Sequence, residues 1–178
     1  QAAQPYIRLL GSNALIVCGK HSAAKRGVLD ELLPILTQNG QGHQLFSEIV
    51  ENPDLQTIMR GKKVFQNGGF DFLIGIGGGS PLDAAKAIML AAANDLREEQ
   101  LYDIVLMILR YPILAIPTTH GTGSEVTPYS VLSDPRIKKK AGFGTDLAFP
   151  DLAVIDPRYT LSLNPRITLN TSIDALSH

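Results

Sequence analysis

The chain has 178 residues, of which 16 are Lys or Arg and 17 are Asp or Glu, so its formal net charge at pH 7 is −1. Its length suits one domain, and its 44% hydrophobic residues are typical of a globular protein. Nothing in this balance indicates nucleic acid or an anionic membrane as partner, so we expect neither. The single cysteine, Cys18, excludes a disulfide framework and indicates a reducing, cytoplasmic compartment.

The two ends and the most apolar stretch also bear on the organisation of the chain. Residues 104–116 are the most apolar region, but Arg110 and Pro112 interrupt it and it is too short to span a bilayer. No targeting segment is visible. The chain starts at Gln1 without methionine and stops at His178 just inside a predicted helix, so we expect both ends to be cut.

Predicted helices and strands alternate regularly in the first part of the chain. Gly19 follows the first predicted strand, and the carboxyl end of a strand is where ligands bind in open parallel sheets. This alternation predicts right-handed crossovers and a parallel sheet, which is an α/β fold. The predicted elements are the end of a helix over residues 1–10, a strand over 14–18, a helix from Ser22 to a stop at Asn39-Gly40, a short strand over 43–46 and a helix over 54–67.

The chain is organised around an apolar run, residues 72–76, that leads into Gly77, Gly78 and Gly79. The run has no polar alternation, which is typical of a parallel strand covered on both faces. Glycines at such a junction let the backbone approach a ligand closely, and the N-terminus of the following helix offers unpaired N–H groups to a phosphate. A dinucleotide pyrophosphate is therefore the expected ligand.

The residues after these glycines predict the start of a helix. Ser80 suits the N-cap, Pro81 the first helical position, and Asp83 the third, where its carboxylate can close a capping box. Glycine-rich turns also occur merely to pack an alanine-rich helix onto a sheet, and this helix is rich in alanine. Leu82 stands where the third glycine of a G-x-G-x-x-G motif would be, so the turn alone leaves the packing explanation open.

A second turn rich in glycine and hydroxyl groups, residues 117–125, follows the strand predicted over 113–116. Two such turns on one edge of a sheet can flank a single crevice, which favours the binding interpretation. The lysine run at 138–140 is typical of a solvated face, although one lysine can reach a cofactor. The remaining predicted elements are a polar connection over 94–100, a helix over 101–109, a strand over 129–132, a turn over 133–135 and a strand over 152–155.

Near the end of the chain, Thr171 is predicted to cap a last helix, which places Asp174 and His178 four residues apart on one face. A carboxylate and an imidazole at this spacing can share one divalent metal ion. Asp174 also stands at the third helical position after Thr171, where it can simply complete a capping box. The residues alone leave both explanations open.

Several motifs together resemble those of the iron-containing (group III) alcohol dehydrogenases. They occur in the family's order and extend over nearly the whole chain, but they resemble only the N-terminal half of a family member. The motifs are Gly77-Gly78-Gly79-Ser80 with Asp83 and Lys86, Pro117-Thr118-Thr119 with Gly121-Thr122-Gly123-Ser124-Glu125, Asp156-Pro157, and Asp174-Ala175-Leu176-Ser177-His178.

This resemblance implies a Rossmann-like parallel sheet with flanking helices, the dehydroquinate-synthase-like fold, over residues 1–157. Residues 158–178 are then expected to begin a truncated helical metal-binding domain. The initial strand hairpin of the family has no counterpart in this sequence. We also expect the protein to form a homo-oligomer.

The same resemblance implies two bound groups, NADP or NAD and a divalent metal ion. The metal is Fe²⁺ in many members and Zn²⁺ in relatives, and it is held by one aspartate and three histidines, of which Asp174 and His178 match the first two. His120 departs from the small residue that is common at its position. The cofactor-binding residues implied are Gly19, Asn52, Gly77, Gly78, Gly79, Ser80, Asp83, Thr118, Thr119 and Lys140.

The implied reaction is hydride transfer between an alcohol or aldehyde and nicotinamide, with the metal polarising the alcohol oxygen. Gly19 stands where many members that use NAD place an aspartate, which binds the ribose hydroxyls and repels a 2′-phosphate, so we expect NADP to be accepted. Two alternatives stay open: a related polyol dehydrogenase, and a non-catalytic dinucleotide-binding or self-associating module. The fragment alone is expected to be inactive, because only half of the metal ligands are present.

Overall fold

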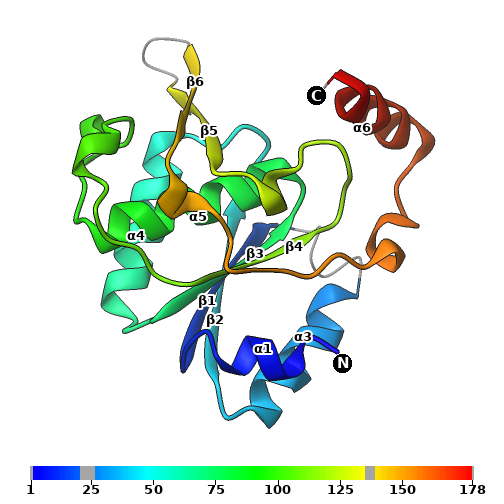
Figure 1. Cartoon of the computed structure of the whole chain (residues 1–178), viewed down its shortest axis with the longest axis horizontal. Helices are drawn as coiled ribbons and strands as arrows, with labels where there is room; N and C mark the ends of the chain where they lie inside the picture. Colours follow the sequence, from blue (N-terminus) through cyan, green and yellow to red (C-terminus); the bar gives the residue numbers. More distant parts are fainter. Residues whose placement is uncertain (1, 21–26, 135–138, 178) are drawn as a thin grey trace.

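The computed structural model describes residues 2–20, 27–134 and 139–177 (Figure 1). Within them, a parallel sheet has five strands in the order β2-β1-β3-β4-β7. The strands are β1 (Asn13–Gly19), β2 (Gly42–Ile49), β3 (Phe72–Gly77), β4 (Ile113–Pro117) and β7 (Leu152–Ala153). This arrangement confirms the predicted α/β fold class, although β7 is shorter than the strand predicted over 152–155.

Helices cover both faces of the sheet (Figure 1). They are α1 (Gln4–Arg8) and α3 (Val28–Gln38) on one face, and α4 (Leu55–Asn67) and α5 (Gly79–Ala93) on the other. Because successive side chains of a strand point to opposite faces, Ile16 of β1 packs with α3, while Leu15 and Val17 pack with α4 and α5. All three side chains are fully buried, which explains why the strand is an unbroken apolar run.

The ends of α3 and α4 follow the signals seen in the sequence. The side chain of Asp54 accepts the Thr57 N–H at 2.7 Å and so caps α4, which confirms the helix predicted over 54–67. Asn39 is the C-cap of α3, and Gly40 follows it with a φ of +73°, so the predicted stop is confirmed. The predicted start at Ser22 lies outside the described residues.

The start of α5 differs from the prediction. Gly78, with an extended backbone, occupies the N-cap, and it makes no side-chain cap. Ser80 therefore lies inside the first turn, and the predicted capping box between Ser80 and Asp83 is wrong. The carboxylate of Asp83 accepts hydrogen bonds from Ser124 and Val131 instead, two residues that approach from other elements.

The helix predicted over residues 101–109 is also wrong, because this segment contains only a single 3₁₀ turn, η2 (Ile104–Leu106). Asn94 accounts for the difference. Its Oδ1 accepts the N–H groups of Ile108 at 2.9 Å and Leu109 at 2.8 Å, and its Nδ2 donates to the Leu109 carbonyl at 2.9 Å. These backbone groups are the ones that a helix would pair internally. Ile108 is left 75% exposed rather than packed on the sheet.

Beside the main sheet, β5 (Tyr129–Asp134) and β6 (Lys139–Gly144) form a separate antiparallel hairpin. The strand predicted over 129–132 is confirmed, but it continues through the first two residues of the predicted turn at 133–135. The hairpin lies over α5 (Figure 1), and Ser130 Oγ donates to the Asp83 carbonyl at 2.9 Å. The hairpin thus covers the side of α5 that faces away from the main sheet.

The last helix, α6 (Pro165–Ser177), begins earlier than predicted. Asn164 Oδ1 accepts the Ile167 N–H at 2.8 Å, so Asn164 lies at the cap position. Thr171 is then inside the helix and cannot cap it, and the capping-box explanation of Asp174 is wrong. The other short turns are the 3₁₀ helices η1 (Glu98–Gln100), η3 (Ser124–Val126), η4 (Asp146–Ala148) and η5 (Pro157–Thr160).

Apolar side chains of α6 face solvent. None of its residues is buried, and Leu169, Ile173 and Leu176 are 60%, 58% and 87% exposed. An apolar face of this kind has no packing partner within the described part of the chain. None of the described helices combines the length and the apolarity that crossing a membrane requires.

We expect the backbone amides of α6 to exchange with deuterium at least about a hundredfold faster than those of α5, because α5 is buried and α6 is not. Hydrogen exchange read by mass spectrometry measures both helices in one experiment. Protection of α6 that rises with protein concentration would show that its apolar face packs against a second copy. Strong protection of α6 in a proven monomer contradicts the prediction.

Candidate functional site

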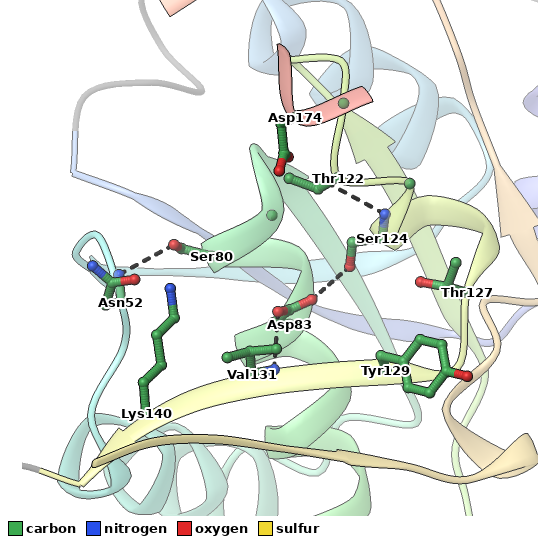
Figure 2. A pocket seen from close by; sticks show the side chains of 13 residues that line it. Asn52, Ser80, Asp83, Thr122, Ser124, Thr127, Tyr129, Val131, Lys140 and Asp174 are labelled. Carbon is green, nitrogen blue, oxygen red and sulfur yellow. Dashed lines mark hydrogen bonds between the residues drawn. The ribbon is translucent and has the colours of Figure 1, made fainter. Parts of the chain in front are cut away.

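A cavity of about 700 Å³ lies where the first turn of α5, the turn after β4, the β5–β6 hairpin and α6 meet (Figure 2). Both glycine-rich turns contribute to its wall, which confirms the prediction that they flank one crevice. The residues that line it are Asn52, Gly79, Ser80, Asp83, Gly121, Thr122, Gly123, Ser124, Thr127, Tyr129, Val131, Lys140 and Asp174.

The glycines at the β3–α5 junction are required by crowding. Gly77 has a φ of +148°, which L side chains rarely adopt. A Cβ at Gly78 would lie 3.0 Å from Thr119 Oγ1, and one at Gly79 would lie 2.9 Å from Thr122 Cγ2. The two turns therefore pack closely, and the free N–H groups at the start of α5 lie beside the cavity. Such groups, together with the helix dipole, favour a phosphate.

Asn52 closes the cavity on another side. It lies between β2 and α4 and has a φ of +56°, a left-handed conformation that asparagine tolerates better than most residues. Its N–H donates to Ser80 Oγ at 3.2 Å. The loop after β2 is thereby joined to the first turn of α5, so the end of a third strand contributes to the site.

A buried network joins α5 to the turn after β4. Ser124 Oγ donates to Asp83 Oδ1 at 2.6 Å and accepts from Lys86 Nζ at 3.0 Å. Lys86, which has no exposed surface, also donates to the carbonyls of Thr127 at 2.7 Å and Tyr129 at 2.9 Å. Every proton of the ammonium group therefore has an acceptor, and the acceptors hold the turn and the hairpin against the helix.

Burial changes the acidity of both charged groups in this network. It lowers the pKa of Lys86 to about 8, although the charges of Asp83 and Glu125 oppose the change. Burial also raises the pKa of the Asp83 carboxyl group, against the hydrogen bonds from Ser124 and Val131. Each shift is the one expected when a charged group is removed from water. Desolvation of the two charges therefore costs free energy, which the hydrogen bonds of the network offset.

The hairpin supplies one wall and a positive charge. Tyr129 and Val131 are two residues apart on β5, so they share one face of the strand, and both line the cavity. Lys140, on β6, is exposed, and Figure 2 shows its side chain extending toward Ser80 and Asn52. An ammonium group here can pair with a phosphate that sits at the start of α5.

Asp174, on α6, lines the side of the cavity that lies opposite Lys140 (Figure 2). It is one of the two metal ligands implied by the sequence, and the other, His178, lies outside the described residues. Within residues 2–20, 27–134 and 139–177, no group of three His, Cys, Asp or Glu side chains is placed to hold a metal ion. The described residues alone therefore do not fit a complete metal site.

Five of the predicted cofactor residues do not line the cavity: Gly19, Gly77, Gly78, Thr118 and Thr119. Gly19 and Gly77 end the neighbouring strands β1 and β3, and β2 lies on the other side of β1, so the chain reverses its direction across the sheet between β1 and β3. Ligands of open α/β sheets bind at this kind of switch point. Thr118 is buried and its N–H donates to the Gly77 carbonyl at 2.8 Å, while Thr119 packs against Gly78.

Some lining residues were not identified from the sequence. Thr127, Tyr129 and Val131 enter the cavity because Lys86 and Asp83 draw the segment after the second turn onto α5. The period-two spacing of Tyr129 and Val131 was a usable signal, since it predicts that both side chains share one face of a strand.

The sequence matches the profile of the family described as iron-containing alcohol dehydrogenase over residues 1–157. This match, over most of the chain, decides the family. The chain belongs to the iron-containing alcohol dehydrogenases. The fold and the order of the motifs agree with this assignment, so the resemblance stated from the sequence is confirmed.

Individual alcohol dehydrogenases are similar to the chain over almost all of its length. A long-chain alcohol dehydrogenase of Geobacillus thermodenitrificans is 35% identical, over 98% of this chain and 45% of its own. An NADPH-dependent butanol dehydrogenase of Clostridium saccharobutylicum is 32% identical, over 96% of this chain and 45% of its own. The crystal structure of an iron-containing alcohol dehydrogenase from Thermotoga maritima superposes with a TM-score of 0.91 at 46% identity, over 97% of this chain and 48% of its own. The chain thus spans a little under half the length of these relatives.

We expect the stability of the wild type to increase with pH relative to that of a Lys86→Met variant, between about pH 8 and 10.5. In this window the unfolded chain keeps a proton on Lys86, whose ordinary pKa is 10.5, while the folded chain has released it. The unfolded state then binds more protons, so raising the pH favours folding, by at most about 1.4 kcal/mol per pH unit.

Urea unfolding of both proteins at several pH values measures this difference. The matched control is Lys63→Met, which removes an exposed lysine from α4. A pH-independent stability difference between wild type and Lys86→Met would show that Lys86 releases no proton on folding in this range.

Proposed function

We propose that the chain is the dinucleotide-binding part of an NAD(P)-dependent and metal-dependent alcohol dehydrogenase. One observation carries the proposal: the cavity brings the N-terminus of α5, two glycine-rich turns and Lys140 together at the carboxyl edge of a parallel sheet. Membership of the family and the name of the NADPH-dependent relative support it. The substrate class that we propose is an alcohol or aldehyde.

The cavity suits the pyrophosphate of a dinucleotide. Gly79 and Ser80, the first two residues of α5, line the cavity, so the N–H groups at the start of the helix are placed to meet a phosphate. Ser80 and Lys140 add a hydroxyl and a positive charge from the flanking walls. We propose that the rest of the cofactor extends over the edge of the sheet past Thr118, Thr119 and Gly19.

The nicotinamide of a bound dinucleotide would accept the hydride that leaves the carbon of the alcohol. The described residues position the cofactor, and no serine or cysteine nucleophile is needed for this chemistry. Asp174 supplies one carboxylate toward a divalent cation, and with His178 it would supply two of the four ligands that the family resemblance implies. We propose that residues 1–157 form the cofactor domain and that 158–178 begin the helical metal-binding domain.

A non-catalytic dinucleotide-binding module is the second candidate, because the described residues hold the cavity but only Asp174 of the metal ligands that the family resemblance implies. Alcohol oxidation distinguishes the two. The assay compares this chain with a version that continues through a helical second half, using NADP, NAD and a series of primary alcohols. Turnover by the extended protein supports the enzyme, whereas dinucleotide binding without turnover supports the module.

We expect the chain alone to bind NADP weakly and to show no tight one-to-one binding of Fe²⁺ or Zn²⁺. The dinucleotide cavity is formed by described residues, but two ligands leave most of the coordination sphere of a metal to water. Calorimetry with each ligand tests both parts. Tight metal binding that is lost in His178→Ala, together with alcohol oxidation, would show that the chain builds a working site in another way.

Replacing Lys140 with methionine is expected to weaken dinucleotide binding about fivefold, which is the effect of losing one exposed ion pair with a phosphate. The affinity of this variant should also depend less on salt than that of the wild type. Calorimetric titration at two salt concentrations measures both effects, with Lys63→Met as the control. Equal affinities in Lys140→Met and Lys63→Met would remove Lys140 from the site.

Gly19→Asp is expected to shift preference from NADP toward NAD by about tenfold, because a carboxylate at the end of β1 can bind the ribose hydroxyls and repel a 2′-phosphate. Gly19 places no charge at this position, and the exposed Lys20 beside it can attract the negative charge of a 2′-phosphate. The ratio of the two dissociation constants is the measurement. An unchanged ratio, or a wild type that binds NADP far more weakly than NAD, contradicts this assignment.

A further inference from the structure

His120 connects the second glycine-rich turn to α6. Its Nε2 lies 2.9 Å from Thr171 Oγ1 and 3.1 Å from Ser172 Oγ. The next residue, Gly121, has a φ of +106°, and a Cβ added to it would overlap the carbonyl oxygen of Thr171. The turn and the helix thus approach through their backbones at the point where His120 forms its hydrogen bonds.

The surroundings of the Thr171 hydroxyl group indicate the direction of this hydrogen bond. The hydroxyl carries one proton, and the carbonyls of Ile167 and Thr168 lie 3.0 and 3.2 Å from Oγ1 as acceptors within the helix. With its proton directed to them, Oγ1 accepts the N–H of His120. Ser172 Oγ is then a second oxygen near the same nitrogen, so the imidazole bridges two successive residues of α6.

These contacts matter because α6 has few others. In this fully described helix, only Thr171 and Asp174 are half-buried, and all the other residues are exposed. The two residues are three apart, so they lie on the same face of the helix. Thr171 contacts the turn through His120 and Gly121, and Asp174 lines the cavity on the same side.

We infer that His120 is a positioning residue that fixes α6, and with it the carboxylate of Asp174, against the turn that walls the dinucleotide cavity. The inference rests on the proposed function, since it takes the cavity to be the cofactor site. It has a consequence for binding: a dinucleotide that orders the turn over residues 117–125 also stabilises α6, because His120 belongs to that turn. The two events are coupled in both directions.

Hydrogen exchange in the absence of ligand tests the positioning role. In His120→Ala, the amides of α6 should exchange about three to ten times faster than in the wild type, the factor expected for one or two lost hydrogen bonds, while those of α5 stay unchanged. His120→Gln keeps an N–H donor and should restore most of the protection. The matched control is His43→Ala, which removes an exposed histidine from β2.

A double substitution separates the hydrogen bond from a general loss of stability. Thr171→Val removes the acceptor, so it should speed exchange of α6 as His120→Ala does, and the double variant should add little to either single change. Equal exchange of α6 in wild type and His120→Ala, or fully additive effects of the two substitutions, would overturn the positioning role.

The same experiment with saturating NADP tests the coupling. The dinucleotide should slow exchange of α6 in the wild type and in His120→Gln, but not in His120→Ala. An unchanged α6 in wild type that demonstrably binds NADP would overturn the coupling. Failure of every variant to bind NADP or NAD would instead overturn the proposed function, and the comparison without ligand would still decide the role of His120.

Discussion

The position of the site depends on the burial of one ammonium group. Lys86 lies on the inner face of α5 with no exposed surface, so it can keep its charge only where acceptors surround it. The acceptors come from the segment that follows β4: the Ser124 hydroxyl and the carbonyls of Thr127 and Tyr129. That segment must therefore close over α5. By doing so it becomes the wall of the cavity and carries β5 into place above the helix.

The second constraint is the close approach of the two turns at the edge of the sheet. Gly78 and Gly79 leave room for Thr119 and Thr122, which belong to the turn after the neighbouring strand. With larger residues at the glycine positions, the turns would separate and the N–H groups of α5 would no longer lie beside the cavity. The groups that this edge offers to a ligand are thus mostly backbone groups, and side chains such as Lys140 add charge around them.

Sequence reasoning succeeded where structure is set locally and failed where distant residues compete. The helix over residues 54–67, which Asp54 caps, and the apolar run of β3 are local features, and both elements were predicted. The capping box expected at Asp83 does not form, because the carboxylate accepts hydrogen bonds from Ser124 and Val131 instead, which lie 41 and 48 residues further along the chain. Likewise, the helix predicted over residues 101–109 does not form, because the side chain of Asn94 accepts the N–H groups of Ile108 and Leu109. A polar side chain with two possible partners cannot be assigned until the fold shows which partner is near.

The cavity was predictable because two glycine-rich turns follow two strands that pair in the sheet, whereas the placement of α6 was not. The sequence put Asp174 and His178 on one face of a helix but held no signal for what that face contacts. In the structure this face meets the second glycine-rich turn. Gly121 lets the backbone of α6 approach closely, and His120 forms a hydrogen bond with Thr171, one helical turn before Asp174. Asp174 lines the cavity from this helix, so its position depends on what holds the helix in place. With no buried residue in α6, that task falls on the few polar contacts made by the turn itself.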